Sequence, residues 1–192
     1  MCPHKASGFT LVELLIALAL TGVVLGAAVT TFVAQRWSYA RQEHVTAMTQ
    51  GTRAAMEMVT RDVRMAGYNP ARTSFDGITY DPTHIHIRAD LNGDGDTADA
   101  QDTIVYAYNT ATHQLMRETD GSSQPIAEHI QAFTVDYVDG AGTSTTTTAN
   151  IRQIRIAITA RTATPDPRYA ANGGYRTYRL TSLVTPKNLA LQ

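Results

Sequence analysis

The sequence is poor in the residues that most often carry reactive chemistry. Its one cysteine is Cys2, so a chain that loses residues 1–8 has no thiol, which excludes disulfides and thiol catalysis. It contains no G-x-S-x-G motif, no serine–histidine–acid spacing and no phosphate-binding glycine loop. The formal net charge of −1 supplies no basic field for nucleic acid. We therefore expect no enzyme, no nucleic-acid partner and no small-molecule substrate.

Charge is almost absent from the stretch between Phe9 and Val33, where Glu13 is the sole ionisable side chain. At about 1.5 Å of rise per residue, a helix of this length can cross a bilayer. A charged side chain inside such a helix costs roughly 2.5–3.5 kcal/mol on insertion scales, so it needs a partner and marks a functional site. We predict a transmembrane and assembly segment over residues 9–33, with Glu13 as its functional residue.

The residues before this stretch differ from it in character. Residues 1–8 are polar and include Lys5, and the change comes at Gly8-Phe9, before the apolar run. A secretory signal would have its cleavage point after the run, and no such point stands out in residues 26–29. An ordinary signal anchor is the alternative interpretation, but it gives no reason for Glu13.

Residues 8–15, with the sequence GFTLVELL, resemble the prepilin cleavage and methylation motif of type IV pilins and type II secretion pseudopilins. The resemblance implies that residues 1–8 are a leader peptide, which a prepilin peptidase of the inner membrane cuts between Gly8 and Phe9. It also implies N-methylation of Phe9 and a mature chain that keeps the apolar helix. Cleavage would give Phe9 a positive amine, and Glu13 is the expected partner of that amine, in its own subunit or in a neighbouring one.

The helix is expected to continue beyond the membrane, with an amphipathic second half over residues 34–67. Apolar and small residues recur there at spacings of three and four. They are Val45, Met48, Thr52, Ala55, Val59, Val63 and Ala66. Gly67 suits a C-cap, so a helix from Phe9 to Ala66 would be on the order of 85 Å long. Gly22 and Gly26 form a G-x-x-x-G pattern, which suits close helix–helix packing and is equally consistent with the glycine tolerance of membrane helices.

Residues 68–192 are expected to form a β head, because the apolar pattern changes there to a period of two. Ile85 and Ile87, for example, alternate with polar residues, as in a half-buried strand. Strands are predicted at residues 83–88, 103–109, 113–119, 131–138, 151–160 and 175–184, with surface loops at 139–150 and 161–174. Hairpin-length links make the strands antiparallel. The expected fold class is α+β: type IV pilin-like, with a long N-terminal helix packed on an antiparallel β-sheet head.

Residues 54–70, with the sequence AAMEMVTRDVRMAGYNP, together with an acidic inter-strand loop and a closing strand before Pro186, resemble the PilW branch of minor pilins. That branch is related to the J-type minor pseudopilins of type II secretion. The resemblance implies a single-pass protein of the inner membrane with a periplasmic head, which later enters the pilus at the cell surface. Its implied partners are other major and minor pilins, the prepilin peptidase and the pilus assembly platform.

The function predicted from these features is that of a minor pilin, a structural and assembly component in a priming or tip complex of a type IV pilus. One alternative is a J-like minor pseudopilin of type II secretion, which the residues do not distinguish from a minor pilin. The other alternative is a pilus-tip adhesin or DNA-uptake module that binds through its loops, although the near-neutral charge argues against strong DNA binding.

The head has one acidic loop with the composition of a metal site, residues 90–102, DLNGDGDTADAQD. Oxygen-bearing side chains at every second residue can turn inward around one calcium ion. Asp90, Asn92 and Asp94 match positions 1, 3 and 5 of an EF-hand loop, and Gly95 matches its sharp turn. Gln101 replaces the closing glutamate, and Asp99 or Asp102 could supply that carboxylate instead. We predict a structural calcium ion, against the alternative of a solvated acidic turn. The candidate ligands are Asp90, Asn92, Asp94, Asp96, Asp99 and Asp102.

Two further sets of side chains are candidate sites. His84 and His86 lie on one face of a predicted strand and could begin a zinc site, but no third ligand is identifiable, so an exposed polar strand face is the favoured interpretation. Six tyrosines could stack on a ligand, but their spacing favours residues of the sheet. They are Tyr106, Tyr108, Tyr137, Tyr169, Tyr175 and Tyr178.

Overall fold

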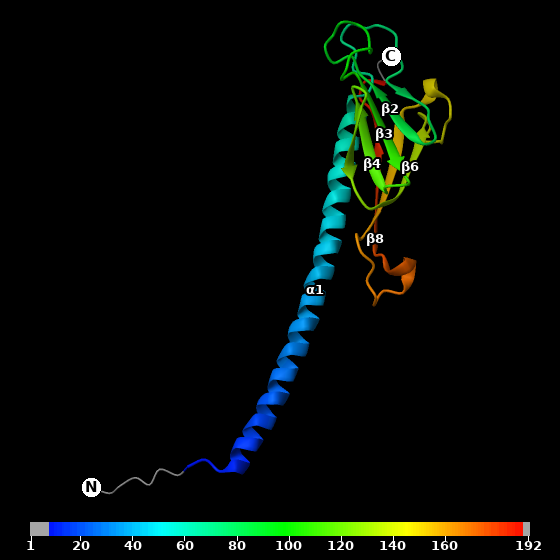
Figure 1. Cartoon of the computed structure of the whole chain (residues 1–192). Coiled ribbons are helices and arrows are strands. Elements are labelled where there is room, and N and C mark those ends of the chain that lie inside the picture. Colours follow the sequence, from blue (N-terminus) through cyan, green and yellow to red (C-terminus); the bar gives the residue numbers. More distant parts are fainter. Residues whose placement is uncertain (1–7, 190–192) are drawn as a thin grey trace, which may run out of the picture. The chain divides into compact units, whose positions relative to one another are not determined.

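The computed structural model describes residues 8–189 of the chain. Cys2 and the predicted leader, apart from Gly8, lie outside the described residues. The chain divides into two units, residues 1–43 and residues 44–192. One helix, α1 (Leu11–Met65), contains the boundary between the units, and all the strands belong to the second unit (Figure 1).

In the first unit, α1 has its apolar side chains on the outside. Leu15, Val24 and Phe32 are all more than half exposed, as are most of the large apolar side chains around them. Within the described part of the chain, α1 is the one helix long and apolar enough to cross a membrane. Apolar surface in water costs roughly 25 cal/mol per Å², so this part of α1 needs lipid or other apolar helices around it.

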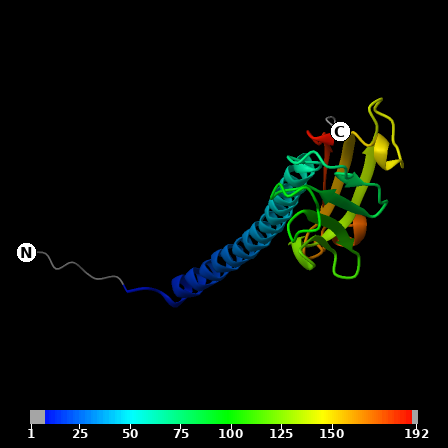
Figure 2. The same ribbon diagram turned by 90° about the horizontal axis from the view of Figure 1, so that it is seen from above.

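The second unit contains two antiparallel sheets, which lie side by side in Figure 2. The five-stranded sheet has the order β1 (Ile78–Thr79), β2 (His84–Arg88), β3 (Thr103–Asn109), β4 (Gln114–Thr119), β5 (Ser122–Ala127). The three-stranded sheet consists of β6 (Ile130–Val138), β7 (Gln153–Arg161) and β8 (Thr177–Val184). Two short 3-10 helices, η1 (Thr148–Asn150) and η2 (Ala171–Gly174), lie in the loops that flank β7.

The helix ends where glycine allows the backbone to turn into the sheet. Gly67 has φ +74°, a left-handed conformation that glycine adopts without steric cost, and its N–H donates to the carbonyl of Arg88 in β2 at 2.8 Å. The backbone of Gly77 lies so close to that of Gly67 that a Cβ atom on Gly77 would be 2.4 Å from the Gly67 backbone. Both glycines are therefore required by this crossing, which brings the end of α1 to the start of the first sheet.

The core of the second unit lies between the buried face of α1 and both sheets. From α1 it takes Ala55, Val59 and Val63, which have the spacing of one helix face. The two sheets add inward-facing residues that alternate along each strand. These include Ile85, Ile87, Tyr106 and Leu115 from the first sheet and Tyr137, Ile154, Ile156 and Ile158 from the second.

Two buried tyrosines connect the elements of this core through their hydroxyl groups. Tyr137, in β6, donates to the carbonyl of His84 in β2 at 2.7 Å and so joins the two sheets. Tyr106, in β3, donates to the carboxylate of Asp62 on α1 at 2.7 Å, and Arg117 Nε, in β4, donates to the same oxygen at 2.8 Å. Burial raises the pKa of both tyrosines well above its usual value, so both hydroxyls stay protonated as donors at neutral pH.

The predicted elements agree with the structure except at the edges of the first sheet. The predicted helix, the C-cap at Gly67 and all six predicted strands are present, with ends that differ by one or two residues. Two strands were not predicted: β1 has only two residues, and β5 contains Pro125 and is polar over most of its length. The strands of the predicted antiparallel head divide between two sheets, and the sequence pattern does not predict this division.

Candidate functional site

The predicted cleavage point lies immediately before α1 and is accessible. Phe9 is 86% exposed, and a Cβ atom placed on Gly8 would meet no atom within 4 Å. Nothing in the described part of the chain therefore shields the bond between these residues from an enzyme.

Glu13 caps the helix from which it projects. Its Oε2 accepts hydrogen bonds from the backbone N–H of Thr10 at 2.9 Å and from the Thr10 hydroxyl at 2.8 Å. In return the Glu13 N–H donates to the hydroxyl oxygen of Thr10 at 3.2 Å. This reciprocal arrangement is a capping box, which satisfies N–H groups that the first turn of a helix leaves without partners. In the uncleaved chain, Glu13 therefore has a local role besides the predicted one toward the Phe9 amine.

Gly22 and Gly26 lie one turn apart on the exposed part of α1. A Cβ atom at either position would have no neighbour within 4 Å, so nothing within the chain itself requires glycine there. The two positions leave a strip of bare backbone on which a second helix could approach closely. The prediction of helix packing at these glycines stays a prediction.

The acidic loop brings together three of its six predicted calcium ligands. Carboxylate oxygens of Asp94, Asp96 and Asp99 all lie within 4.8 Å of one another. The amide nitrogen of Asn92 lies between two of these groups, 3.0 Å from Asp94 Oδ2 and 2.6 Å from Asp99 Oδ2. Asp94 raises the pKa of Asp99, first through a shared hydrogen bond and then through its charge, so the cluster has the repulsion that a cation would relieve.

Asp90 and Asp102 lie outside that cluster of three and shape the loop from its base. Both are buried. The two oxygens of Asp90 accept the backbone N–H groups of Gly93 at 2.6 Å and Gly95 at 3.1 Å. Asp102 Oδ1 accepts the N–H of Leu91 at 3.1 Å. These bonds close the loop on itself and hold the outer carboxylates near one another.

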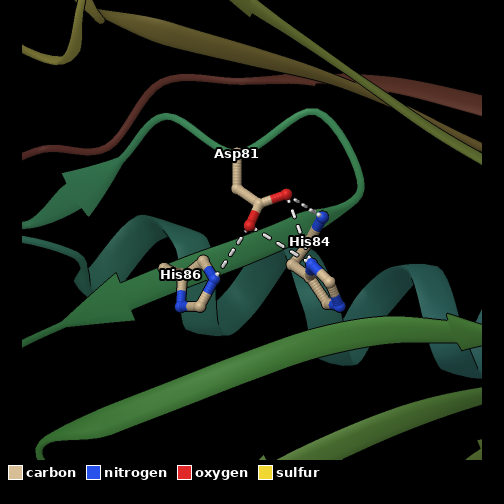
Figure 3. Close-up of side chains that lie close together, drawn as sticks. All are labelled: Asp81, His84 and His86. Carbon is tan, nitrogen blue, oxygen red and sulfur yellow. Dashed lines mark hydrogen bonds and ion pairs between the residues drawn. The ribbon is translucent and has the colours of Figure 1, made fainter.

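The histidines of β2 have a third side chain beside them. Asp81, in the turn before β2, places its carboxylate between His84 and His86 (Figure 3). Burial by itself raises the pKa of Asp81, but hydrogen bonds from Thr83 and His84 outweigh it and hold that pKa well below its usual value. The carboxylate is therefore ionised where it faces the two imidazoles.

Comparison with known proteins bears on the N-terminal segment and on the fold. Residues 3–29 match the family model of the prokaryotic N-terminal methylation motif. The structure resembles a type IV-like pilin from Thermus thermophilus with a TM-score of 0.53, at 12% sequence identity, over 73% of this chain and 97% of that chain. The chain has the type IV pilin fold. No curated protein matches the sequence significantly.

The pilin fold confirms the predicted fold class, and the motif match confirms the prepilin-type N-terminus. Two local arrangements in this pilin-like chain were not predicted from the sequence. The capping box was readable, because Thr10-x-x-Glu13 has its signature spacing. The third member of the histidine cluster, Asp81, precedes His84 by only three residues. Its side chain lies beside β2 because the chain makes a turn between Asp81 and His84, and the spacing alone does not reveal that turn.

Proposed function

We propose that this chain is a minor pilin, a structural and assembly subunit of a type IV pilus. The observation that carries the proposal is the combination of a prepilin motif with the pilin fold. The exposed apolar part of α1 supports it, because that surface suits lipid before assembly and a bundle of like helices afterwards. The partners that follow from this role are other pilins, a prepilin peptidase and the assembly platform of the inner membrane.

The proposed mechanism begins with a precursor held in the inner membrane by residues 9–33, with its head in the periplasm. Removal of residues 1–8 turns the amide nitrogen of Phe9 into a charged amine. In the low dielectric of a helix bundle, an unpaired charge is costly and a well-placed pair is tolerated. Pairing of the Phe9 amine with Glu13 would thus fix the axial position of each subunit, and the exposed apolar helix would supply the rest of the contact.

Cleavage gives the direct test of this proposal. Expressed with a prepilin peptidase, the chain is expected to lose residues 1–8 and to begin at an N-methylated Phe9, as measured by mass spectrometry. Gly8→Val should abolish the mass change, because a branched side chain replaces the open backbone at the scissile bond. Ser7→Val, one residue earlier, is the matched control and should be cleaved. A wild-type chain that keeps residues 1–8 in the presence of an active peptidase would contradict the proposal.

The two alternatives, a J-like minor pseudopilin and a DNA-uptake module, differ from a minor pilin in the experimental results that they predict. A minor pilin is expected in sheared surface filaments, and its deletion should reduce piliation. A J-like minor pseudopilin would leave piliation intact and reduce protein secretion instead. A DNA-uptake module would shift a DNA fragment in a low-salt gel, because such binding rests on phosphate contacts that salt weakens.

We propose in addition that the acidic loop holds a structural calcium ion. The donor set fits the ion, since calcium prefers carboxylate and carbonyl oxygens. Asp94, Asp96 and Asp99 are the ligands that the loop gathers, and the amide oxygen of Asn92 can join them by turning its side chain. The ion would replace the repulsion between the carboxylates with attraction and would stiffen the connection between β2 and β3.

The calcium proposal predicts a melting temperature that rises with calcium and not with magnesium. Asp94→Ala should remove that rise, whereas Asp76→Ala, an exposed aspartate outside the loop, should keep it. Asp99→Asn should remove the calcium response and also raise the melting temperature of the calcium-free protein, because it removes one of the two negative charges that face each other at Asp94 and Asp99. A rise of equal size in Asp94→Ala and in the wild type would overturn the proposal.

A further inference from the structure

The cluster of Asp81, His84 and His86 combines two imidazoles and a carboxylate on one partly exposed face of the first sheet. His84 and His86 are the first and third residues of β2, so they project to the same side, while Ile85 and Ile87 between and after them are buried in the core. Asp81 reaches that side from the preceding turn. Its Oδ2 lies 3.2 Å from His84 Nδ1 and 3.3 Å from His86 Nε2 (Figure 3).

The Asp81 carboxylate is held in this orientation by donors on its other oxygen. Oδ1 accepts the backbone N–H of Thr83 at 2.7 Å, the Thr83 hydroxyl at 2.8 Å and the backbone N–H of His84 at 3.0 Å. Three donors on Oδ1 fix the plane of the carboxylate. His84 Nδ1 lies 3.2 Å from each carboxylate oxygen and 2.8 Å from the Thr83 hydroxyl oxygen, and His86 Nε2 lies 3.3 Å from Oδ2. Outer-shell hydrogen bonds of this kind orient the ligands in metal sites.

The spacing of the three side chains fits a tetrahedral zinc site. Zinc binds nitrogen and carboxylate oxygen at about 2.0–2.1 Å, which places two ligand atoms of a tetrahedron about 3.3 Å apart. The two distances from Asp81 Oδ2 already have this value. One ligand atom from each of the three residues lies within 4.8 Å of the others. The two imidazole nitrogens would therefore have to approach each other by no more than about 1.5 Å to form the third edge of such a site.

We propose that Asp81, His84 and His86 form a binding site for a divalent transition metal, with zinc as the natural occupant. Two histidines and one carboxylate leave a fourth position open, and the side chains are exposed by 26–41%, so water completes the coordination. The bound ion would cross-link Asp81, in the turn before β2, to His84 and His86 in the strand. The site goes beyond the proposed role as a pilin and differs in chemistry from the acidic loop, which offers only oxygen ligands.

Metal titration of the untagged full chain in detergent tests the site. After treatment with a chelator, the wild type is expected to bind one zinc ion in isothermal titration calorimetry and to give the visible absorption of tetrahedral cobalt when Co²⁺ is added. His86→Gln should weaken zinc binding by roughly 100-fold or more, since even outer-shell changes cost 10–100-fold. His44→Gln, which removes an imidazole from α1, is the matched control and should bind as the wild type does.

A second pair of readouts separates a metal site from a plain hydrogen-bonded cluster. With zinc about 100-fold above its Kd, the melting temperature should rise by roughly 5–10 °C in the wild type and in Asp94→Ala, but not in His86→Gln or His84→Gln. Copper and nickel should compete with zinc, whereas calcium and magnesium should not. Absence of zinc uptake by the wild type, or zinc binding by His86→Gln equal to that of His44→Gln, would overturn the proposal, because the three side chains would then only bond to one another.

Discussion

Asp62→Ala is expected to lower the free energy of unfolding by about 3 kcal/mol. Asp62 lies on the buried face of α1, where a single carboxylate oxygen accepts from both Tyr106 and Arg117. Removing it leaves a guanidinium and a hydroxyl without their common acceptor. Breaking a buried charge pair costs about 3–5 kcal/mol. The lower end applies here, because the Arg117 side chain keeps 26% exposure and can turn toward water.

Urea unfolding of the full chain in detergent, followed by circular dichroism, measures this loss, which corresponds to a fall in melting temperature of roughly 6–12 °C. Asp136→Ala is the control, because Asp136 pairs with Arg155 on an exposed sheet face, where such pairs contribute at most about 1 kcal/mol. In Asp62→Ala, the better helix propensity of alanine offsets no more than about 0.7 kcal/mol of the lost unfolding free energy. Equal losses in the two variants would show that the buried pair contributes no more than a surface one.

That pair illustrates what the sequence could not reveal. The helix face around Val59 was predicted from spacings of three and four, because the residues that make it are neighbours on one element. Asp62 falls on the same face and breaks the apolar pattern. Its partners, Tyr106 and Arg117, are 44 and 55 residues away, and only the packing of α1 on β3 and β4 brings them together. Local periodicity gives the elements, whereas long-range pairing decides which polar groups can be buried.

The same distinction explains the errors in the head. The predicted strands have apolar alternation because one face of each packs on the core. β5 lacks that pattern, since its first four residues are exposed and it lies at the edge of its sheet. The division into two sheets follows from the break between β5 and β6, where consecutive strands do not pair. Hairpin-length links in the sequence indicate antiparallel neighbours but do not mark such a break.

Site residues could be predicted from the sequence where the site consists of one continuous segment. The prepilin motif and the acidic loop are continuous segments, so both could be located without a structure. Which carboxylates of the loop meet was not predictable. The buried Asp90 and Asp102 accept backbone N–H groups at the base of the loop, and Asp94, Asp96 and Asp99 cluster outside it. The histidine cluster needed the geometry of a turn, which spacing alone does not supply.

Glu13→Ala is expected to leave membrane insertion intact and to lower incorporation into filaments roughly 100-fold. Insertion becomes easier, because the one charge in residues 9–33 is removed at a saving of roughly 2.5–3.5 kcal/mol. In the filament, however, the amine of Phe9 then lacks its proposed partner in a low-dielectric helix bundle. An uncompensated charge of this kind costs about 3 kcal/mol or more, which is a factor of at least about 100 in binding. Immunoblots of sheared filaments, normalised to the membrane fraction, measure the ratio.

The capping box makes it possible to separate this proposed role of Glu13 from the one that the structure already displays. Glu13→Gln keeps an oxygen that can accept from Thr10 but has no charge, whereas Thr10→Ala loses the reciprocal hydroxyl and keeps the charge. If pairing with the amine governs assembly, Glu13→Gln fails as Glu13→Ala does, and Thr10→Ala enters filaments at a cost of about 1 kcal/mol in helix stability. Normal incorporation of Glu13→Gln would mean that Glu13 serves only to begin the helix, and the register of the subunits would then have to come from the apolar surface of α1 alone.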